Sequence, residues 1–201
     1  MTELRNSLFL RLRIICLAAL LLMVVCSVVL PQEEILVPMR VQVPILMKIL
    51  TFNRAMKFEQ GSQLTIGILY QRGLRKSSDM KDEFIQIIKD GSTFKLNGIT
   101  VRGIPIDLEE ENDIEKYCLT NKVDVIYVTS IRSFSLESII TLSRKNHILS
   151  MTGIPEYVEE GISVGIGIRG EKPEILINRN AAIAEGAEFT AQLLNLSKII
   201  K

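Results

Sequence analysis

The sequence predicts an α/β fold with a mostly parallel, three-layer sheet. Short apolar runs rich in β-branched residues, such as Leu64–Tyr70 (LTIGILY) and Val123–Val128 (VDVIYV), predict buried strands. Segments with helical periodicity lie between them, and strands that alternate with helices form parallel βαβ units with right-handed crossovers. The chain has 201 residues, of which 47% are hydrophobic and 23% charged, a composition that fits one globular domain.

The first expected element of this domain is a helix over Pro38–Asn53, which carries Val43, Leu46 and Leu50 on one stripe. The next elements alternate in kind up to residue 152. They are, in chain order, the strand Leu64–Tyr70, a helix capped by Ser78 and Asp79 and stopped by Gly91, a turn at Asn97-Gly98, the strand Ile99–Ile106, a helix over Glu109–Asn121, the strand Val123–Val128, a helix capped by Ser135 and running through Lys145, and the strand Ile148–Thr152.

After Gly153 the pattern changes. Ile162–Ile168 and Glu174–Ile177 face each other across Arg169–Lys172, which predicts an antiparallel hairpin. Ala181–Ile200 carries apolar residues at helical spacing and predicts one long helix that closes the domain.

The amino-terminal segment has the pattern of an export signal. Ile14 to Leu30 contains no charged residue and follows Arg5, Arg11 and Arg13. We expect residues 1–30 to be a signal peptide cleaved near Ser27, or else a signal anchor that keeps residues 14–30 in the inner membrane. Residues 31–40 would then be a linker and residues 41–201 a periplasmic domain that touches the membrane only through this segment.

The composition excludes several function classes. With 24 basic and 23 acidic residues, the chain has no positive field for a phosphate backbone, so we expect no nucleic-acid partner. Its single histidine, His147, lies between a helix and a strand, where a surface or capping role is common. Cys118 is the one cysteine outside the apolar run, so the domain cannot close an internal disulfide. We therefore expect no catalytic residues, no metal and no cofactor.

Gly165-Ile166-Gly167-Ile168-Arg169-Gly170 matches the G-x-G-x-x-G pattern of dinucleotide-binding proteins. That function requires the glycines to turn a strand into a helix whose N–H groups face the pyrophosphate. Here the glycines alternate with apolar residues inside an expected strand, and another strand follows. We interpret them as places where a neighbouring element approaches closely.

Polar residues follow several expected strands at their carboxyl ends, where open parallel sheets bind ligands. The candidate ligand-binding residues are Gln71, Thr129, Arg132, Ser133 and Thr152. Arg132 followed by Ser133 could hold a carboxylate or another small anion; alternatively, all five only cap helices. Glu156 and Tyr157 form an expected exposed turn that a partner protein could contact.

The carboxyl half also resembles a known family. Asp124–Val128 (DVIYV), Thr152–Gly161 (TGIPEYVEEG), Ile175–Ala182 (ILINRNAA) and Gly186 followed by Gln192–Ser197 (QLLNLS) resemble the YfiR family of exported bacterial proteins. Leu64–Leu69 is similar to that family's first strand, so the resemblance spans about residues 41–200. Order and spacing together make it specific.

The resemblance implies a small periplasmic α/β domain, often dimeric and without known catalysis. It implies binding to, and repression of, the periplasmic domain of an inner-membrane sensor such as a diguanylate cyclase, with effects on cyclic di-GMP and biofilm growth. The apolar faces of the first and last helices would form a homodimer surface or close the core. The sheet also resembles the Rossmann-like half of a periplasmic solute-binding protein, so the alternative function is the binding of a small solute.

Overall fold

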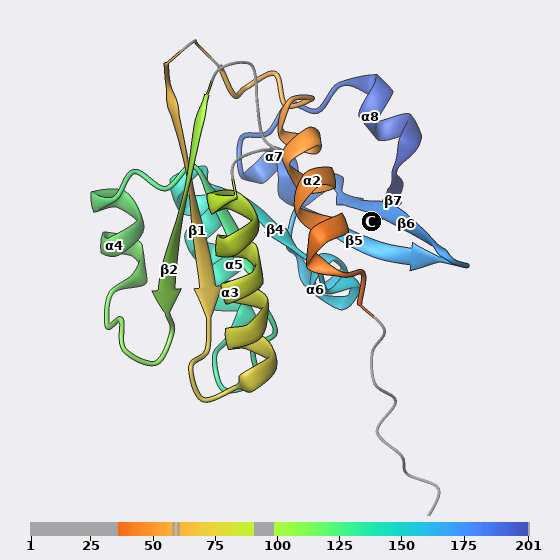
Figure 1. Cartoon of the computed structure of the whole chain (residues 1–201). Helices are drawn as coiled ribbons and strands as arrows, with labels where there is room; N and C mark the ends of the chain where they lie inside the picture. Colours follow the sequence, from red (N-terminus) through yellow and green to blue (C-terminus); the bar gives the residue numbers. More distant parts are fainter. Residues whose placement is uncertain (1–35, 58, 60, 91–98, 201) are drawn as a thin grey trace, which may run out of the picture. The chain divides into compact units, whose positions relative to one another are not determined.

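The computed structural model describes residues 36–57, 59, 61–90 and 99–200 (Figure 1). Its elements are, in chain order, α2 (Met39–Leu50), β1 (Gln63–Tyr70), α3 (Arg75–Lys89), β2 (Thr100–Asp107), α4 (Ile114–Thr120), β3 (Val125–Val128), α5 (Leu136–Asn146), β4 (Leu149–Thr152), α6 (Pro155–Glu160), β5 (Val164–Arg169), β6 (Lys172–Asn178), α7 (Arg179–Ala184), α8 (Ala191–Leu196) and β7 (Lys198–Ile200).

The described strands form one sheet in the order β2-β1-β3-β4-β5-β6-β7. All neighbouring pairs are parallel except β5 and β6, which form the antiparallel hairpin that the sequence predicts. The expected α/β class with a mostly parallel sheet is therefore confirmed. β1 pairs with both β2 and β3, so the strand order reverses on either side of β1.

Side chains along the central strands point alternately to the two faces of the sheet, and helices pack on both faces. In β3, Val125 and Tyr127 pack with α2 and α3, whereas Ile126 and Val128 pack with α4 and α5. All four residues are buried, as expected for a parallel strand between two helical layers. Figure 1 shows α2 and α3 in front of the sheet.

The core on the α2 face contains a polar pair. Tyr127, fully buried, stacks at a tilt on Phe84, with ring centroids 4.6 Å apart. Its hydroxyl donates to Oε1 of the buried Gln42, 2.9 Å away, and the Gln42 amide donates to the Val37 carbonyl. The buried hydroxyl therefore has the partner that it needs. This pair fixes α2 against β3.

The expected long helix over Ala181–Ile200 is wrong. The chain forms two short helices, α7 and α8, and then adds β7 to the sheet beside β6. Residues 185–190 leave the helical path because they pair with the end of α2: Phe189 forms a β-bridge with Asn53, and Arg54 donates its N–H to the Glu188 carbonyl. Gly186, at φ +81°, makes the turn.

Ser135 caps α5 as predicted, accepting from the Ser138 N–H. Several other expected boundaries differ from the structure: the helix expected through Asn53 ends at Leu50, and the strand expected from Ile162 begins at Val164. α3 begins at Arg75 rather than after Ser78. α4 begins after Asp113, which caps it, so Glu109–Glu111 precede the helix. The expected turn at Glu156 and Tyr157 is the start of α6, with Pro155 in the first turn. Gly91 and Asn97-Gly98 lie outside the described residues.

No helix in the described part of the chain has the length and apolar character needed to cross a bilayer. The apolar run Ile14–Leu30 lies outside the described residues.

Candidate functional site

The predicted ligand-binding residues lie at the carboxyl edge of the sheet. Gln71 directly follows β1, and Thr129 to Ser133 follow β3, its neighbour. Because the strand order reverses around β1, this is the point where open α/β sheets leave a crevice for a ligand. The structure thus brings Gln71, Thr129, Arg132 and Ser133 together, as the sequence analysis expects.

Oε1 of Gln71 and the hydroxyl of Thr129 are hydrogen-bonded within the protein. Gln71 is buried, and its Oε1 accepts from the backbone N–H groups of Arg132 (2.9 Å) and Ser133 (3.3 Å). Thr129, also buried, donates to the Leu69 carbonyl and lies 2.6 Å from the hydroxyl of Ser77, which accepts from the Gln71 N–H. These bonds join the loops after β1 and β3.

Thr152 follows the same pattern on β4. Its buried hydroxyl donates to the Val128 carbonyl (2.9 Å) and accepts from the Ile154 N–H (3.1 Å). The side chains of Arg132 and Ser133 are exposed. At this edge, therefore, the side chains of Arg132 and Ser133 are open to a ligand, whereas the hydroxyls of Thr129 and Thr152 and Oε1 of Gln71 are bound to the protein.

The predicted partner-binding residues differ in exposure. Glu156 is exposed on α6, whereas Tyr157 is half-buried. The Tyr157 hydroxyl donates to the Ile131 carbonyl (3.1 Å) and accepts from the Ile131 N–H (3.0 Å). Tyr157 thus ties the loop after β3 to α6.

The G-x-G-x-x-G glycines lie in β5 and the hairpin turn, and the strand β6 follows them directly, where the dinucleotide motif needs a helix. A Cβ on Gly165 would lie 2.4 Å from Cγ2 of Val158 on α6, and one on Gly167 would lie 3.2 Å from Leu176. These glycines let α6 approach β5 closely and leave room for the Leu176 side chain over β5. The structure therefore confirms the packing interpretation of the motif.

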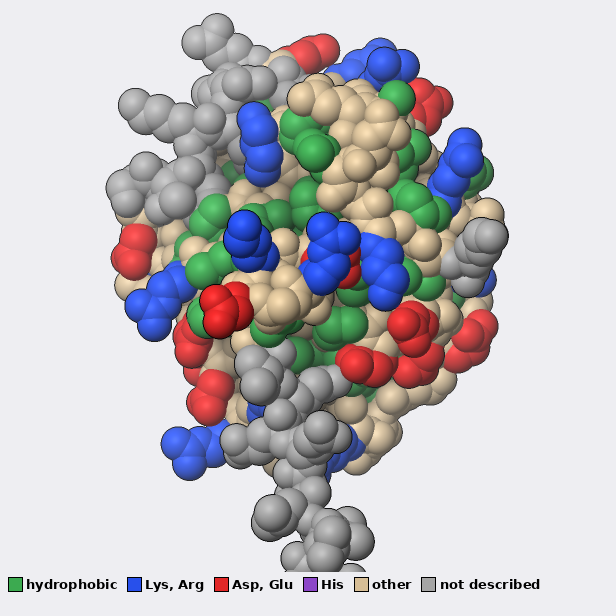
Figure 2. Space-filling model, turned by 90° about the vertical axis from the view of Figure 1, so that its right-hand side faces the viewer, with side chains coloured by type: hydrophobic (Ala, Val, Ile, Leu, Met, Phe, Trp, Pro, Cys, Tyr) green, Lys and Arg blue, Asp and Glu red, His purple; other side chains and the backbone are tan. Residues whose placement is uncertain are grey.

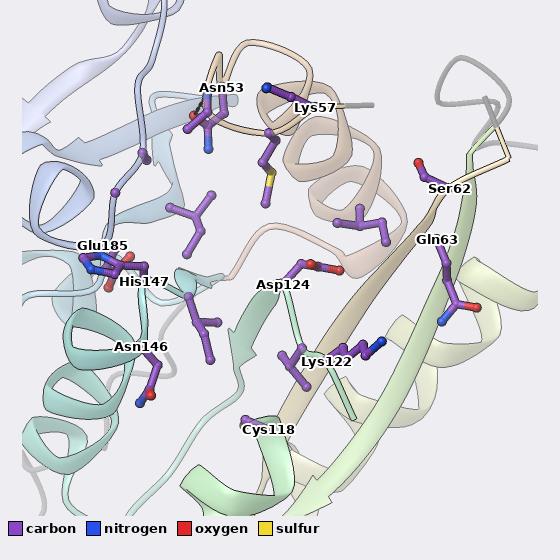
Figure 3. A pocket seen from close by; sticks show the side chains of 18 of the residues that line it. Asn53, Lys57, Ser62, Gln63, Cys118, Lys122, Asp124, Asn146, His147 and Glu185 are labelled. Carbon is purple, nitrogen blue, oxygen red and sulfur yellow. Dashed lines mark hydrogen bonds between the residues drawn. The ribbon is translucent and has the colours of Figure 1, made fainter. Parts of the chain in front are cut away.

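A cavity that the sequence analysis does not predict lies at the opposite edge of the sheet. We call it the basal pocket; it has a volume of about 530 Å³ and lies at the amino ends of β1, β3 and β4 (Figure 3). Its lining comes from the ends of α2, α4, α5 and α7 and from the strand starts, and includes Asn53, Lys57, Leu64, Cys118, Lys122, Val123, Asp124, His147, Glu185 and Ala187.

Two of the lining residues adopt an uncommon backbone. Lys122 (φ +53°) and His147 (φ +54°) are the non-glycine residues with positive φ in the described part of the chain. His147 ends α5 in the left-handed conformation, and this agrees with the capping role that the sequence predicts. Non-glycine residues with this backbone are rare and occur often at functional sites.

The two acidic residues of the basal pocket have raised pKa values. Burial raises the pKa of Asp124, although its Oδ2 accepts from the Thr65 N–H at 2.8 Å. Burial also raises the pKa of Glu185 to about 7, and hydrogen bonds from Ser150 and Ser163 oppose the rise. Shifted carboxyl groups around a cavity are typical of binding or catalytic sites.

Cys118 lines the basal pocket as a protected thiol. The residue is fully buried, and this burial, together with the nearby Glu111 and Glu115, raises the pKa of its thiol to about 11. A thiol with such a pKa is a poor nucleophile at neutral pH. Among the described residues, no three His, Cys, Asp or Glu side chains are close enough to hold a metal ion.

The described domain matches the model of a known protein family. The model of the YfiR/HmsC-like family matches residues 41–198, nearly all of the described domain. The chain belongs to the YfiR/HmsC-like family. This confirms the resemblance drawn from the DVIYV, TGIPEYVEEG and ILINRNAA segments. Among proteins of curated function, none matches the chain.

Solved structures share the fold of this YfiR/HmsC-like domain. An ABC domain in complex with L-Trp from Streptococcus pneumoniae has a TM-score of 0.56 at 17% identity, covering 82% of this chain and 62% of that one. A conserved domain protein from Vibrio cholerae has a TM-score of 0.57 at 15% identity, covering 84% and 61%. A ligand-free, open substrate-binding protein from Clostridium difficile has a TM-score of 0.51 at 19% identity, covering 69% and 54%. The chain therefore spans less than two thirds of each.

Proposed function

We propose that this protein is an exported regulator that binds the periplasmic domain of an inner-membrane signalling protein, such as a diguanylate cyclase, and holds it inactive. In this proposal, residues 1–30 direct export as a signal peptide or anchor, and residues 41–201 form the binding domain. Residues 31–40 are the linker between them. The family match over residues 41–198 carries this proposal. The sequence pattern before residue 31 agrees with it.

One surface is suited to such a partner. We call it the hairpin-end surface: the groove of about 820 Å³ between the β5–β6 hairpin and the end of α8, lined by Ile168, Arg169, Lys172, Glu174, Leu196 and Lys198 among others. Leu196 is 68% exposed and Ile168 40% exposed. Large apolar side chains exposed next to one another are typical of protein interaction sites.

The charges around this groove favour an acidic partner. Arg169, Lys172 and Lys198 line it together with one carboxylate, Glu174, whose Oε1 lies 3.4 Å from Nη1 of Arg169. Figure 2 looks at this side of the molecule and shows lysine and arginine side chains in a band between apolar patches. We therefore propose that the partner presents an apolar centre with an acidic rim. Glu156 and Tyr157 on α6 remain proposed further contacts.

We expect Leu196→Asp to reduce capture of the membrane partner at least tenfold, because it places a carboxylate in the apolar centre of the contact. The measurement is recovery of cross-linked membrane proteins on the tagged, exported chain, followed by immunoblot for the cyclase. Leu119→Asp is the matched control, since Leu119 is 55% exposed on α4, which Figure 1 shows on the opposite side of the domain from the β5–β6 hairpin. Equal capture by wild type and Leu196→Asp would exclude this surface, and no captured signalling protein would contradict the proposed function.

The alternative function, solute binding at the carboxyl edge, is favoured by the exposed side chains of Arg132 and Ser133 beside the reversal of strand order. If this alternative holds, at least one amino acid or small anion in a thermal-shift screen raises the melting temperature of the wild type. The same compound does not raise the melting temperature of Arg132→Ala. A flat screen for the wild type would reject this alternative.

A further inference from the structure

The basal pocket has an apolar floor. Five apolar residues of the lining are also buried in the core: Leu64, Val123, Ile148, Leu149 and Ala187. Figure 3 labels Cys118 and the polar residues of the lining, which come from several separate segments of the chain. Such a floor favours the apolar body of a ligand, with polar groups at the margin to orient it.

The acidic groups of the basal pocket are engaged by the protein. Both Glu185 oxygens accept hydrogen bonds, from the Ser150 N–H (2.8 Å), the Ser150 hydroxyl (2.6 Å) and the Ser163 hydroxyl. Asp124 accepts from the Thr65 N–H with Oδ2, and its Oδ1 has no hydrogen-bond partner among the described residues. Several of the last carbonyls of α4 and α5 accept from the N–H groups that follow each helix. Glu185 is therefore occupied by the protein, and Asp124 keeps one free oxygen.

Three side-chain donors of the basal pocket, in contrast, have no hydrogen-bond or ion-pair partner among the described residues. Asn53 is 5% exposed, and its Oδ1 accepts from the N–H groups of Ala55 (3.2 Å) and Glu188 (2.8 Å), which leaves Nδ2 without a partner among the described residues. Figure 3 shows this amide nitrogen directed into the cavity. Lys57, four residues further along, and Lys122 are exposed at the rim and form no ion pair within the described ranges.

We propose that the basal pocket binds a small amphipathic carboxylate, with its apolar body on the floor and its carboxylate at Asn53 and Lys57. The Lys57 ammonium and the buried Asn53 amide both donate charge-assisted hydrogen bonds to the carboxylate, and Lys57 adds its opposite charge. Because Asn53 also joins the end of α2 to the segment before α8, a ligand there stabilises this junction. This site is separate from the hairpin-end surface and does not depend on it.

Octanoate, octylamine and 1-octanol have the same chain with three head groups, and their titration into the full domain tests the proposal. Calorimetry should detect octanoate binding only, and the Asn53 side-chain amide signals should shift in the NMR spectrum. Lys57→Glu should weaken octanoate binding about tenfold, whereas Lys57→Arg and Lys116→Glu, an exposed lysine on α4 outside the pocket, should leave it unchanged. Equal binding of all three compounds, no effect of Lys57→Glu, or no binding of octanoate at millimolar concentration would overturn it.

Discussion

Replacing Glu185 with glutamine is expected to make the protein more stable at pH 8 than the wild type by roughly 3 kcal/mol and to leave the two nearly equal below pH 5. The cause is the burial of this carboxyl group, which is 2% exposed at the end of α7. Burial raises its pKa from the ordinary 4.5 to about 7. The hydrogen bonds from Ser150 and Ser163 and the charge of Arg144 oppose this rise without cancelling it.

The direction of the effect follows from proton binding. Between pH 4.5 and 7 the folded protein holds a proton on Glu185 that the unfolded chain has released. The stabilisation from that proton is complete below the unfolded pKa of 4.5 and is lost as pH rises through 7, so the free energy of unfolding falls over this interval. Glutamine does not titrate, and the two serine hydroxyls can reorient to donate to its oxygen and accept from its amide.

Urea unfolding at pH 5, 6, 7 and 8 measures this effect as the difference between Glu185→Gln and the wild type. Glu188→Gln is the matched control, because Glu188 is exposed three residues further along the same segment. A difference that stays constant from pH 5 to pH 8 would show that Glu185 is ionised throughout, and the proposed cause would be wrong.

Gly165→Ala is expected to destabilise the domain by about 1–3 kcal/mol. The new methyl group would lie 2.4 Å from Cγ2 of Val158, which is fully buried on α6 and cannot move toward solvent. α6 would have to shift away from β5. Because Tyr157 holds the loop after β3, we also expect faster amide exchange at Ile131.

Chemical denaturation of Gly165→Ala, Val158→Ala and the double variant tests this packing. The double variant should lose less stability than the sum of the two single variants, since Val158→Ala removes the clashing methyl group. Gly170→Asn is the control: Gly170 lies in the hairpin turn at φ +65° with no atom within 4 Å of a Cβ, and asparagine tolerates that backbone. Equal stability of Gly165→Ala and Gly170→Asn would contradict the close approach of α6.

Short-range patterns predicted most of the sheet. Runs such as Leu64–Tyr70 are apolar on both faces because helices cover both sides, and this local signal does not depend on the rest of the fold. The closing helix was wrong for the opposite reason. The break in residues 185–190 depends on pairing between Phe189 and Asn53, which are far apart in sequence. Helical periodicity cannot report such a contact.

For the candidate sites, too, some features follow from local sequence patterns, and others depend on contacts between residues far apart in the sequence. The sequence predicted that Gln71 and Arg132 lie at one edge of the sheet, because that follows from strand order. It could not predict that the Gln71 side chain turns inward to hold the next loop. The basal pocket was missed because its lining comes from several segments that meet only in the fold. The one local signal was His147 directly after a helix, which also suits a simple cap.

We propose that this domain acts outside the cytoplasm on a membrane-bound signalling protein. The cellular level of cyclic di-GMP tests this proposal in a strain that lacks the chain and is then complemented in two ways. The full sequence should return the raised level to normal, whereas residues 31–201, which keep the described domain but lack the apolar run Ile14–Leu30, should not. If the shorter form lowers cyclic di-GMP as well as the full sequence does, the proposed function is wrong.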